Sequence, residues 1–357
     1  MEPTRGIKIT IDTAAVRENI AHIKRKYTGY AYYMAVVKAN AYGHGLDRRL
    51  IQSIIDGGAD YLVVCYMDDA VRLRADFPDF PILVLNPAED ADVQTANRYG
   101  ITLTADSAEC AARIARQATA GLRVHIKVDT GLHRFGVEKK EELTAMYRTL
   151  AASAAQVEGI YTHLVSEEDV ALMDAQIERF FALCADIPLS EIPIVHIPSG
   201  EALTVLPKVE KYARINGTRM GSIIYGMIDA SVGVRSAFRA TTRVIALREV
   251  KAGETIGYQG CYTAAQDERL AMLPIGYEMG FLRGYRQHFV YAGDLQCPVV
   301  GSVFMCQTYV RVDPSVKIGD CVEVFRDFAH ICTLSDKMGT IPEEIILALK
   351  PTVVEYR

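Results

Sequence analysis

Lys38 is the residue of this sequence best placed for covalent chemistry, because it directly follows the apolar run Ala35-Val36-Val37. The apolar neighbours remove part of the lysine stem from water, which favours the neutral form of the amine. A neutral amine is the form that attacks a carbonyl carbon to give a Schiff base. The alternative is a lysine whose stem covers apolar surface while its ammonium group reaches solvent.

Small and polar residues follow several later apolar runs. Small residues at the start of a loop let backbone N–H groups approach a phosphate closely, although they are also common in ordinary turns. Together with a lysine at the same edge of a sheet, they suggest a phosphorylated aldehyde as the ligand. The residues concerned are Arg134, His163, Ser199, Gly200, Arg219, Gly221 and Ser222.

Between residues 10 and 232, eight short apolar runs alternate with segments of helical period. Such alternation is typical of strand–helix units around a parallel sheet, and eight units favour a closed (β/α)8 barrel. In a barrel, the carboxyl ends of the strands and the loops after them carry the active site, which brings the residues above together. The predicted strands cover residues 30–37, 61–64, 81–85, 101–104, 122–128, 157–164, 192–197 and 211–215.

From residue 233 onward, the pattern changes to short alternating strands without long helical segments. A run of strands after a run of strand–helix units predicts a separate, mostly antiparallel β domain over residues 233–357. The N-terminal strand, residues 1–9, precedes the first barrel unit, and we assign it to this second domain. The fold class is therefore α/β, with a TIM-type barrel followed by a β domain.

Length and composition fit this organisation. The chain has 357 residues, half of them apolar, and its net charge of -5 is not concentrated in any block. This favours a small-molecule partner over nucleic acid. No signal-peptide pattern opens the sequence and no apolar run approaches the roughly 18 residues of a membrane span, which predicts a cytoplasmic protein without a membrane partner. The eight cysteines and eight histidines lack ligand spacing, so no metal site is expected.

The segment MAVVKANAYGHG (34–45) resembles the cofactor-lysine signature of the alanine racemase family, and the resemblance continues in order along nearly the whole chain. It implies pyridoxal 5'-phosphate as the cofactor, held by Lys38 as a Schiff base. It also implies that Tyr42 hydrogen-bonds the cofactor phosphate. The activity implied is that of an isomerase that interconverts L- and D-amino acids.

Two further barrel segments match the family. HIKVDTGLHRFG (125–136) resembles the segment whose arginine, here Arg134, contacts the cofactor phenolate oxygen and the substrate carboxylate. Lys127 matches a lysine that can be carbamylated and then steadies that arginine. The sequence YTHL places His163 where the family has a histidine near the cofactor ring.

The segment RMGSIIYG (219–226) resembles the loop in which an arginine, here Arg219, meets the pyridine nitrogen. Gly221 and Ser222 then give backbone contacts to the phosphate. A guanidinium group keeps that nitrogen unprotonated and limits electron flow into the ring. A carboxylate there would favour decarboxylation, so Arg219 separates this chain from ornithine and diaminopimelate decarboxylases.

Two segments of the β domain complete the resemblance. LPIGYEMGFLR (273–283) is similar to the motif of the opposing catalytic tyrosine, here Tyr277, and GSVFMCQ (301–307) to the stretch whose methionine amide, here Met305, binds the substrate carboxylate. In the family both come from the partner subunit, which implies a homodimer with shared active sites. Lys38 and the partner subunit's Tyr277 would serve as two bases, one on each face of the substrate.

Three places depart from the family pattern. HIPSG puts Gly200 where a phosphate-binding serine is usual, and Ser199 where asparagine is common. FMCQ puts Cys306 in place of an aspartate. TIPEE (340–344) puts Glu343 in place of the tyrosine that narrows the substrate pocket and touches the phosphate.

Glu343 leaves the choice of substrate open. If its side chain turns to solvent, the wider pocket accepts alanine, serine or a larger side chain. If it turns inward, it pairs with the cation of ornithine, lysine or arginine, which makes the protein a racemase for basic amino acids. A third interpretation is a non-racemising regulatory protein that binds pyridoxal phosphate, because Gly200 and Glu343 both change the phosphate site.

Overall fold

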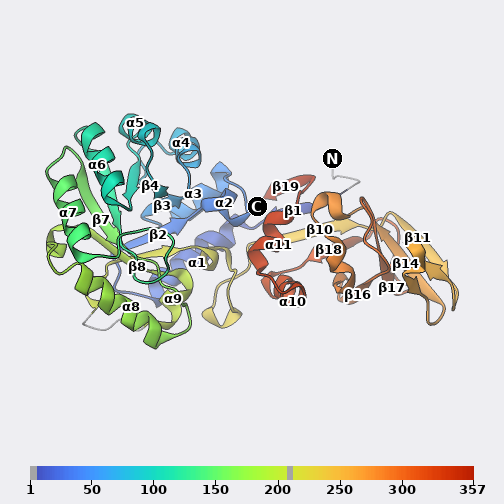
Figure 1. Cartoon of the computed structure of the whole chain (residues 1–357). Helices are drawn as coiled ribbons and strands as arrows, with labels where there is room; N and C mark the ends of the chain where they lie inside the picture. The colour runs from blue at the N-terminus through green and yellow to red at the C-terminus, as the bar shows by residue number, and fades with distance from the viewer. Residues whose placement is uncertain (1–5, 207–211) are drawn as a thin grey trace. The chain divides into compact units, whose positions relative to one another are not determined.

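A computed structural model describes residues 6–206 and 212–357 (Figure 1). The described residues divide into two compact units. The first, called the barrel unit below, comprises Val16–Ile224 and Ala230–Val234. The second, called the sheet unit, comprises the residues up to Ala15, Tyr225–Asp229 and Arg235–Arg357.

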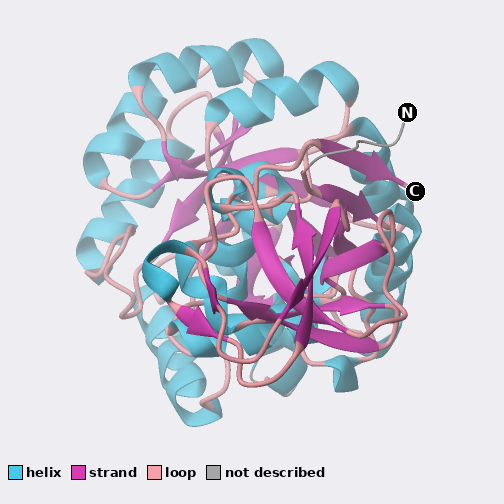
Figure 2. Ribbon diagram, turned by 90° about the vertical axis from the view of Figure 1, so that its right-hand side faces the viewer, coloured by secondary structure: helices cyan, strands magenta, loops and turns pink. Residues whose placement is uncertain are grey.

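The strands of the barrel unit form a closed parallel barrel in the order of the sequence, which confirms the predicted (β/α)8 fold. Helices lie on the outside of this barrel (Figures 1 and 2). The strands are β2 (Tyr32–Val36), β3 (Tyr61–Val64), β4 (Ile82–Pro87), β5 (Thr102–Ala105), β6 (Arg123–Lys127), β7 (Gln156–Tyr161), β8 (Ile194–Ser199) and β9 (Gly217–Met220).

The helices have local sequence signals of their own. Asp47 caps α3 by accepting the Arg49 N–H at 2.9 Å, and α3 buries Leu50 and Ile54 toward the barrel. The helices are α1 (Thr13–Lys26), α2 (Lys38–Tyr42), α3 (Arg48–Asp56), α4 (Met67–Asp76), α5 (Asp90–Tyr99), α6 (Ala108–Gln117), α7 (Lys140–Ala151), α8 (Val170–Leu183) and α9 (Gly200–Val205).

The eighth barrel strand was predicted wrongly at 211–215. Residue 211 lies outside the described residues, and residues 212–215 form a turn before β9. The turn is held by the Arg214 side chain, whose Nε donates to the carbonyl of Leu189 at 2.7 Å. The true strand, GTRM, has little apolar signal because its inward position carries a buried arginine. Arg219 therefore lies within the last strand and not after it.

The sheet unit is built on a nine-stranded sheet in the order β11-β14-β17-β16-β15-β18-β10-β1-β19. β1 (Lys8–Ile11) pairs antiparallel with β10 and parallel with β19. The sheet is otherwise antiparallel, which confirms the predicted mostly antiparallel architecture. Its other strands are β10 (Phe238–Arg243), β11 (Ala246–Val250), β14 (Glu268–Leu273), β15 (Phe289–Ala292), β16 (Leu295–Val300), β17 (Thr308–Val312), β18 (Cys321–Phe325) and β19 (Val353–Tyr356).

Two helices that the strand pattern did not predict complete the sheet unit, α10 (Phe328–Met338) and α11 (Pro342–Ala348). A separate two-stranded ribbon pairs β12 (Thr255–Ile256) with β13 (Tyr262–Thr263). Within the described part of the chain, every helix is too short or too polar to cross a membrane.

Candidate active site

The backbone just after Lys38 follows an uncommon left-handed path. The four residues that follow Lys38 all have φ between 52° and 55°: Ala39, Asn40, Ala41 and Tyr42. This conformation costs a non-glycine residue roughly 1–2 kcal/mol, so four in succession persist only where other contacts impose them. The Asn40 carbonyl accepts the Gly45 N–H at 2.8 Å, and Asn40 Oδ1 accepts the Leu46 N–H at 2.8 Å. The turn fixes where Lys38 and Tyr42 leave the backbone.

Tyr42 and the two predicted phosphate loops lie together. The Tyr42 ring centroid is 5.6 Å from Lys38 Nζ. A Cβ on Gly221 would lie 2.3 Å from Tyr42 Oη, and a Cβ on Gly200 would lie 2.4 Å from the Ile223 side chain. The Gly200 Cβ position is also only 3.6 Å from the Gly221 amide nitrogen. A side chain at either position would require Tyr42 or Ile223 to shift, so backbone groups line this corner of the barrel mouth.

The two serines of these loops have different surroundings. Ser222 begins the short 3-10 helix Ser222–Tyr225 and is buried. Ser199 ends β8, and its hydroxyl caps α9 by accepting the Ala202 N–H at 3.2 Å. The same hydroxyl donates to Glu167 Oε1 at 2.6 Å. Ser199 is therefore already engaged on both sides.

Arg219 is buried in the barrel, where its two terminal nitrogens donate to five acceptors. Nη1 donates to His196 Nδ1 at 2.8 Å and to the His196 carbonyl at 3.0 Å. Nη2 donates to the carbonyls of Thr162 and Ile197, at 2.8 and 3.1 Å, and to His163 Nδ1 at 3.2 Å. The remaining donor, Nε–H, has no hydrogen-bond partner within the described residues. A guanidinium group held this firmly presents one donor in a fixed direction.

His163 shows how much positive charge gathers at the barrel mouth. Burial and the surrounding cations lower the pKa of His163 to about 2, so the ring is neutral. The neutral His163 ring therefore accepts a hydrogen bond from Arg219 and adds no further positive charge. The cations are Arg219, Arg134, Lys127 and Lys38. A site with this excess of positive charge is suited to an anionic ligand.

Arg134 and Lys127 differ in exposure. Arg134 is exposed, and its backbone N–H donates to Asp129 Oδ2 at 3.2 Å. Lys127 is buried, and its Nζ donates to the Val128 carbonyl at 2.8 Å. Burial, reinforced by the positive charge of Arg219, lowers the pKa of Lys127 to about 7. Near neutral pH, a substantial part of the Lys127 amine is therefore neutral and nucleophilic.

A cavity of about 440 Å³ opens at this end of the barrel, along the loop that follows β7. Two of the predicted site residues, Arg134 and His163, line it. Glu167 and Glu168 line it as well, and these two acidic residues were not among the predicted site residues. The cavity therefore combines a group suited to a carboxylate with two groups suited to a cation.

The sheet unit brings Tyr277 and Met305 together. The Tyr277 N–H donates to the Phe304 carbonyl and the Glu278 N–H to the Met305 carbonyl, both at 3.1 Å. A Cβ on Gly276 would lie 2.3 Å from both carbonyl oxygens, so the two loops pack backbone against backbone. Tyr277 is 39% exposed and Met305 is 55% exposed, so the pair presents apolar surface to its surroundings.

The two residues that depart from the family pattern in this unit have distinct settings. A hydrogen bond with Glu278 raises the pKa of the Cys306 thiol, so this cysteine stays protonated. Glu343 is half-buried in the first turn of α11, where the helix dipole favours a negative charge. An acidic residue at position 343 therefore suits the start of this helix, whether or not a ligand binds nearby.

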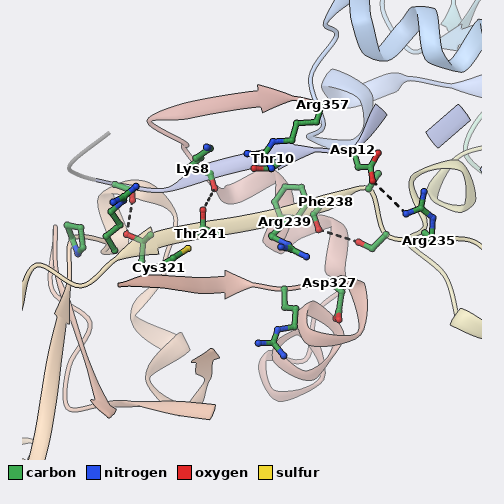
Figure 3. Close-up of a pocket in the computed structure, with 17 residues that line it drawn as sticks. Lys8, Thr10, Asp12, Arg235, Phe238, Arg239, Thr241, Cys321, Asp327 and Arg357 are labelled. Atoms are coloured by element: carbon green, nitrogen blue, oxygen red, sulfur yellow. Dashed lines mark hydrogen bonds and ion pairs between the residues drawn. The ribbon is translucent and has the colours of Figure 1, made fainter. Parts of the chain in front are cut away.

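A larger cavity of about 910 Å³ lies in the sheet unit, along β1 and β10 (Figure 3). It contains none of the predicted site residues. Several cations line it, but they are already compensated: Lys8 pairs with Glu355 at 2.6 Å and Arg235 with Asp12 at 3.8 Å. The concentrated positive charge is thus at the barrel mouth, which we take as the candidate active site.

Two family models match the chain. The N-terminal domain of alanine racemase matches residues 11–229, and the C-terminal domain of alanine racemase matches residues 237–356. The chain belongs to the alanine racemase family. This confirms the resemblance seen in the sequence and makes the chain an enzyme, an isomerase in a family of pyridoxal-phosphate-dependent racemases.

Individual relatives agree over the whole length. The chain is 30% identical to the alanine racemase of Streptococcus uberis, over 97% of this chain and 96% of the relative. Its fold matches the crystal structure of alanine racemase from E. faecalis with a TM-score of 0.89 and 29% identity, covering 99% and 98% of the two chains. A histidine racemase from Leuconostoc mesenteroides also matches, with a TM-score of 0.85 and 26% identity over 99% and 98% of the chains.

A buried polar group in the barrel core was not predicted from the sequence. It consists of His125, Glu158 and His196, which lie on β6, β7 and β8. Each strand carries this polar residue next to apolar ones, which is unusual for a barrel core, but the pattern does not show that the three side chains meet.

Proposed function

We propose that this protein is a pyridoxal 5'-phosphate-dependent racemase that interconverts the L and D forms of a small amino acid, with alanine as the first candidate and serine as the second. The observation that carries the proposal is the position of Lys38 at the carboxyl end of β2, beside the contact between Tyr42 and Gly221. This arrangement places an amine next to a corner lined by backbone.

The residues of the barrel mouth fit this cofactor. Gly200 and Gly221 leave their backbone open to a phosphate, and Tyr42 Oη lies at the same corner. Arg219 Nε–H is a donor suited to the pyridine nitrogen, which is an acceptor. The Ser199 hydroxyl is engaged with Glu167, and Gly200 has no side chain, so this loop offers the phosphate backbone groups only. The surrounding cations compensate the phosphate charge.

Each residue has a distinct task in the proposed reaction. The cofactor, when bound, draws electrons from the substrate Cα and so makes its hydrogen acidic. Lys38 holds the cofactor and exchanges the proton on the D side. The partner subunit's Tyr277 exchanges it on the other face. Arg134 orients the substrate carboxylate together with the partner subunit's Met305, while His163 steadies Arg219 and remains neutral.

The substrate can be tested by proton exchange. Each L-amino acid is incubated with the cofactor-loaded protein in D2O, and loss of the Cα proton signal is followed by NMR. We expect exchange with alanine, and exchange with serine at a lower rate. Cofactor binding without exchange on any amino acid would instead support the non-racemising regulatory protein.

A cationic substrate is the second candidate, and the cavity supplies a specific reason for it. Glu167 and Glu168 line the same space as Arg134, so an amino acid bound there by its carboxylate would meet two negative charges. The similarity to a histidine racemase supports a side chain larger than that of alanine. Glu343 would add a third carboxylate if it turns toward the substrate.

Replacing Glu343 by glutamine separates these substrate classes. If Glu343 binds a cationic side chain, E343Q is expected to lower kcat/KM for ornithine about tenfold relative to alanine, because a charge-assisted hydrogen bond is lost. E344Q serves as the matched control, since Glu344 is the exposed neighbour in the same helical turn. An unchanged ratio of the two activities in E343Q would exclude a direct role of Glu343 in recognising cations.

We also propose a homodimer with shared active sites, working in the cytoplasm. The exposed Tyr277 and Met305 supply apolar surface for a partner, and the eight cysteines are free, as expected in a reducing compartment. K38A and Y277F are each expected to be inactive alone. After the two variants are mixed under conditions that exchange subunits, about one quarter of wild-type activity should return, because half of the dimers carry one intact site.

The outcome of mixing distinguishes the two arrangements. Recovery requires that one chain supplies Lys38 and its partner supplies Tyr277. A mixture that stays inactive, although mass spectrometry shows mixed dimers, would place both residues of a site in one chain. Y258F is the matched control, because Tyr258 is likewise an exposed tyrosine of the sheet unit.

Lys127 is expected to carry a carbamate at neutral and higher pH. Its folded-state pKa of about 7 lies below the ordinary 10.5, so the unfolded chain binds more protons between these values. The unmodified protein should therefore gain stability as pH rises from about 7 toward 10.5. In the same window the neutral amine reacts with carbon dioxide, and the anionic product faces Arg134 and Arg219.

Carbamylation is measured by 13C NMR after addition of 13C-bicarbonate. We expect one protein carbamate signal at pH 8, which fades below pH 7 as the amine is protonated. The signal should be absent in K127A and retained in K139A, since Lys139 is an exposed lysine on the same stretch of chain. A signal that persists in K127A would assign the modification elsewhere.

A further inference from the structure

A continuous row of polar groups runs from Arg219 into the interior of the barrel. His196 Nε2 lies 2.8 Å from His125 Nδ1, and His125 Nε2 lies 3.1 Å from Glu158 Oε2. Tyr61 Oη donates to the same carboxylate oxygen at 2.6 Å. Both histidines are fully buried, and the Glu158 side chain is 14% exposed.

The barrel makes room for these rings at two glycines. A Cβ on Gly159 would lie 2.5 Å from His125 Nδ1, and a Cβ on Gly217 would lie 2.8 Å from His196 Cβ. Glycine weakens a strand, so its presence within β7 and β9 indicates that the space is needed. The Tyr161 ring also stacks on His196, with centroids 4.5 Å apart and planes 13° apart. The row is thus a built feature of the core.

The positions of the protons follow from the two ends of the row. A guanidinium group only donates, so His196 Nδ1 must accept and the His196 proton is on Nε2. That proton is donated to His125 Nδ1, which puts the His125 proton on Nε2, facing Glu158. Every hydrogen bond points from Arg219 to the carboxylate, and an extra proton on either ring would set two donors against each other.

Arg219 makes no ion pair with a carboxylate within the part of the chain that the structure describes. A buried cation without compensation is costly, and buried charges are normally paired. We propose that Glu158 is the counter-ion of Arg219, connected to it through the Nε2-protonated tautomers of His196 and His125. Glu158 is in this sense a positioning residue.

The electrostatic environment agrees with this assignment. Burial, together with the nearby arginine charge, lowers the pKa of His196, and burial lowers the pKa of His125, so both rings are neutral. Although burial by itself raises the pKa of Glu158, hydrogen bonds from His125 and Tyr61 and the charge of Arg123 bring that pKa below its ordinary value. A neutral pair of rings between opposite charges lets each hydrogen bond strengthen the next.

The consequence for activity rests on the proposed function. If Arg219 Nε–H meets the cofactor nitrogen, the carboxylate at the far end helps to keep the guanidinium group charged and fixed in direction. Replacing Glu158 by an uncharged residue would then weaken the Arg219 Nε–H donor, although Glu158 itself contacts neither cofactor nor substrate. E158Q is expected to lower kcat about tenfold to hundredfold, by analogy with the loss of a group that orients a metal-binding side chain, with little change in KM.

The first test determines which nitrogen of each histidine ring is protonated, and it needs no activity assay. Imidazole 15N NMR of histidine-labelled wild-type protein reads which ring nitrogen carries the proton, and we expect neutral, Nε2-protonated rings for His125 and His196. In E158Q we expect displaced 15N shifts for both rings and faster water exchange of the Arg219 guanidinium protons. R123Q removes a charge that lies 3.6 Å from Glu158 but outside the row, and it should leave both ring tautomers as they are in the wild-type protein.

Two results would overturn the proposal, and a third would separate it from the proposed function. An Nδ1-protonated or doubly protonated ring at either histidine of the wild-type protein overturns the proposal, even if E158Q fails to fold. A folded E158Q whose ring shifts and guanidinium exchange equal those of the wild-type protein also overturns it. If the tautomers are as expected but Lys38 takes up no cofactor, the proposed function fails and the buried counter-ion remains.

Discussion

K38A is expected to lower kcat for racemisation by about 10⁴-fold or more, because the variant loses both the cofactor anchor and the base on one face of the substrate. The measurement is the rate of Cα proton exchange in D2O with saturating alanine and added cofactor. The strained left-handed turn after Lys38 is the structural reason to expect no substitute, since it fixes the direction from which the amine enters the site.

Two further variants serve as controls for K38A. K38R keeps the positive charge but provides no amine for an imine, so it should be as inactive as K38A. K139A changes an exposed lysine and should retain wild-type activity. Activity in K38A within tenfold of wild type would mean that another residue anchors the cofactor.

R219K is expected to reduce kcat by about 10²- to 10³-fold, because one fixed donor aimed at developing charge is lost. It should also destabilise the protein by about 2–5 kcal/mol, since an ammonium group has three donors for five buried acceptors. The two effects are measured separately, by steady-state kinetics and by urea unfolding.

Arg74 offers a matched control for Arg219. Its guanidinium group is also buried and donates to five backbone carbonyls, those of Phe77, Pro78, Phe80, Tyr99 and Gly100. R74K should therefore lower stability to a similar extent while kcat stays close to wild type. If R74K and R219K lost the same activity, the effect of Arg219 would be structural alone.

The barrel could be predicted because most of its strands are buried on both faces. β3 is buried at every residue and gives the continuous apolar run Tyr61–Val64. β9 has no such run, because its first residue, Gly217, leaves room for the His196 side chain and Arg219 points into the polar core. The strand that carries Arg219 of the candidate site is therefore one with a weak hydrophobic pattern.

The polar row from Arg219 to Glu158 could not be predicted from one sequence. His125 and Glu158 are 33 residues apart, and their contact depends on the pairing register, which sets His125 beside Gly159. The left-handed turn after Lys38 was equally hidden, because none of its residues is a glycine and the hydrogen bonds of Asn40 with Gly45 and Leu46 that hold it form only in the folded loop.

Borohydride trapping tests the central claim most directly. The protein is loaded with pyridoxal phosphate, reduced with sodium borohydride and digested, and the modified lysine is located by mass spectrometry. A single pyridoxyl group on Lys38 is the predicted result. Stable labelling of another lysine, or no labelling of cofactor-saturated protein, would contradict it.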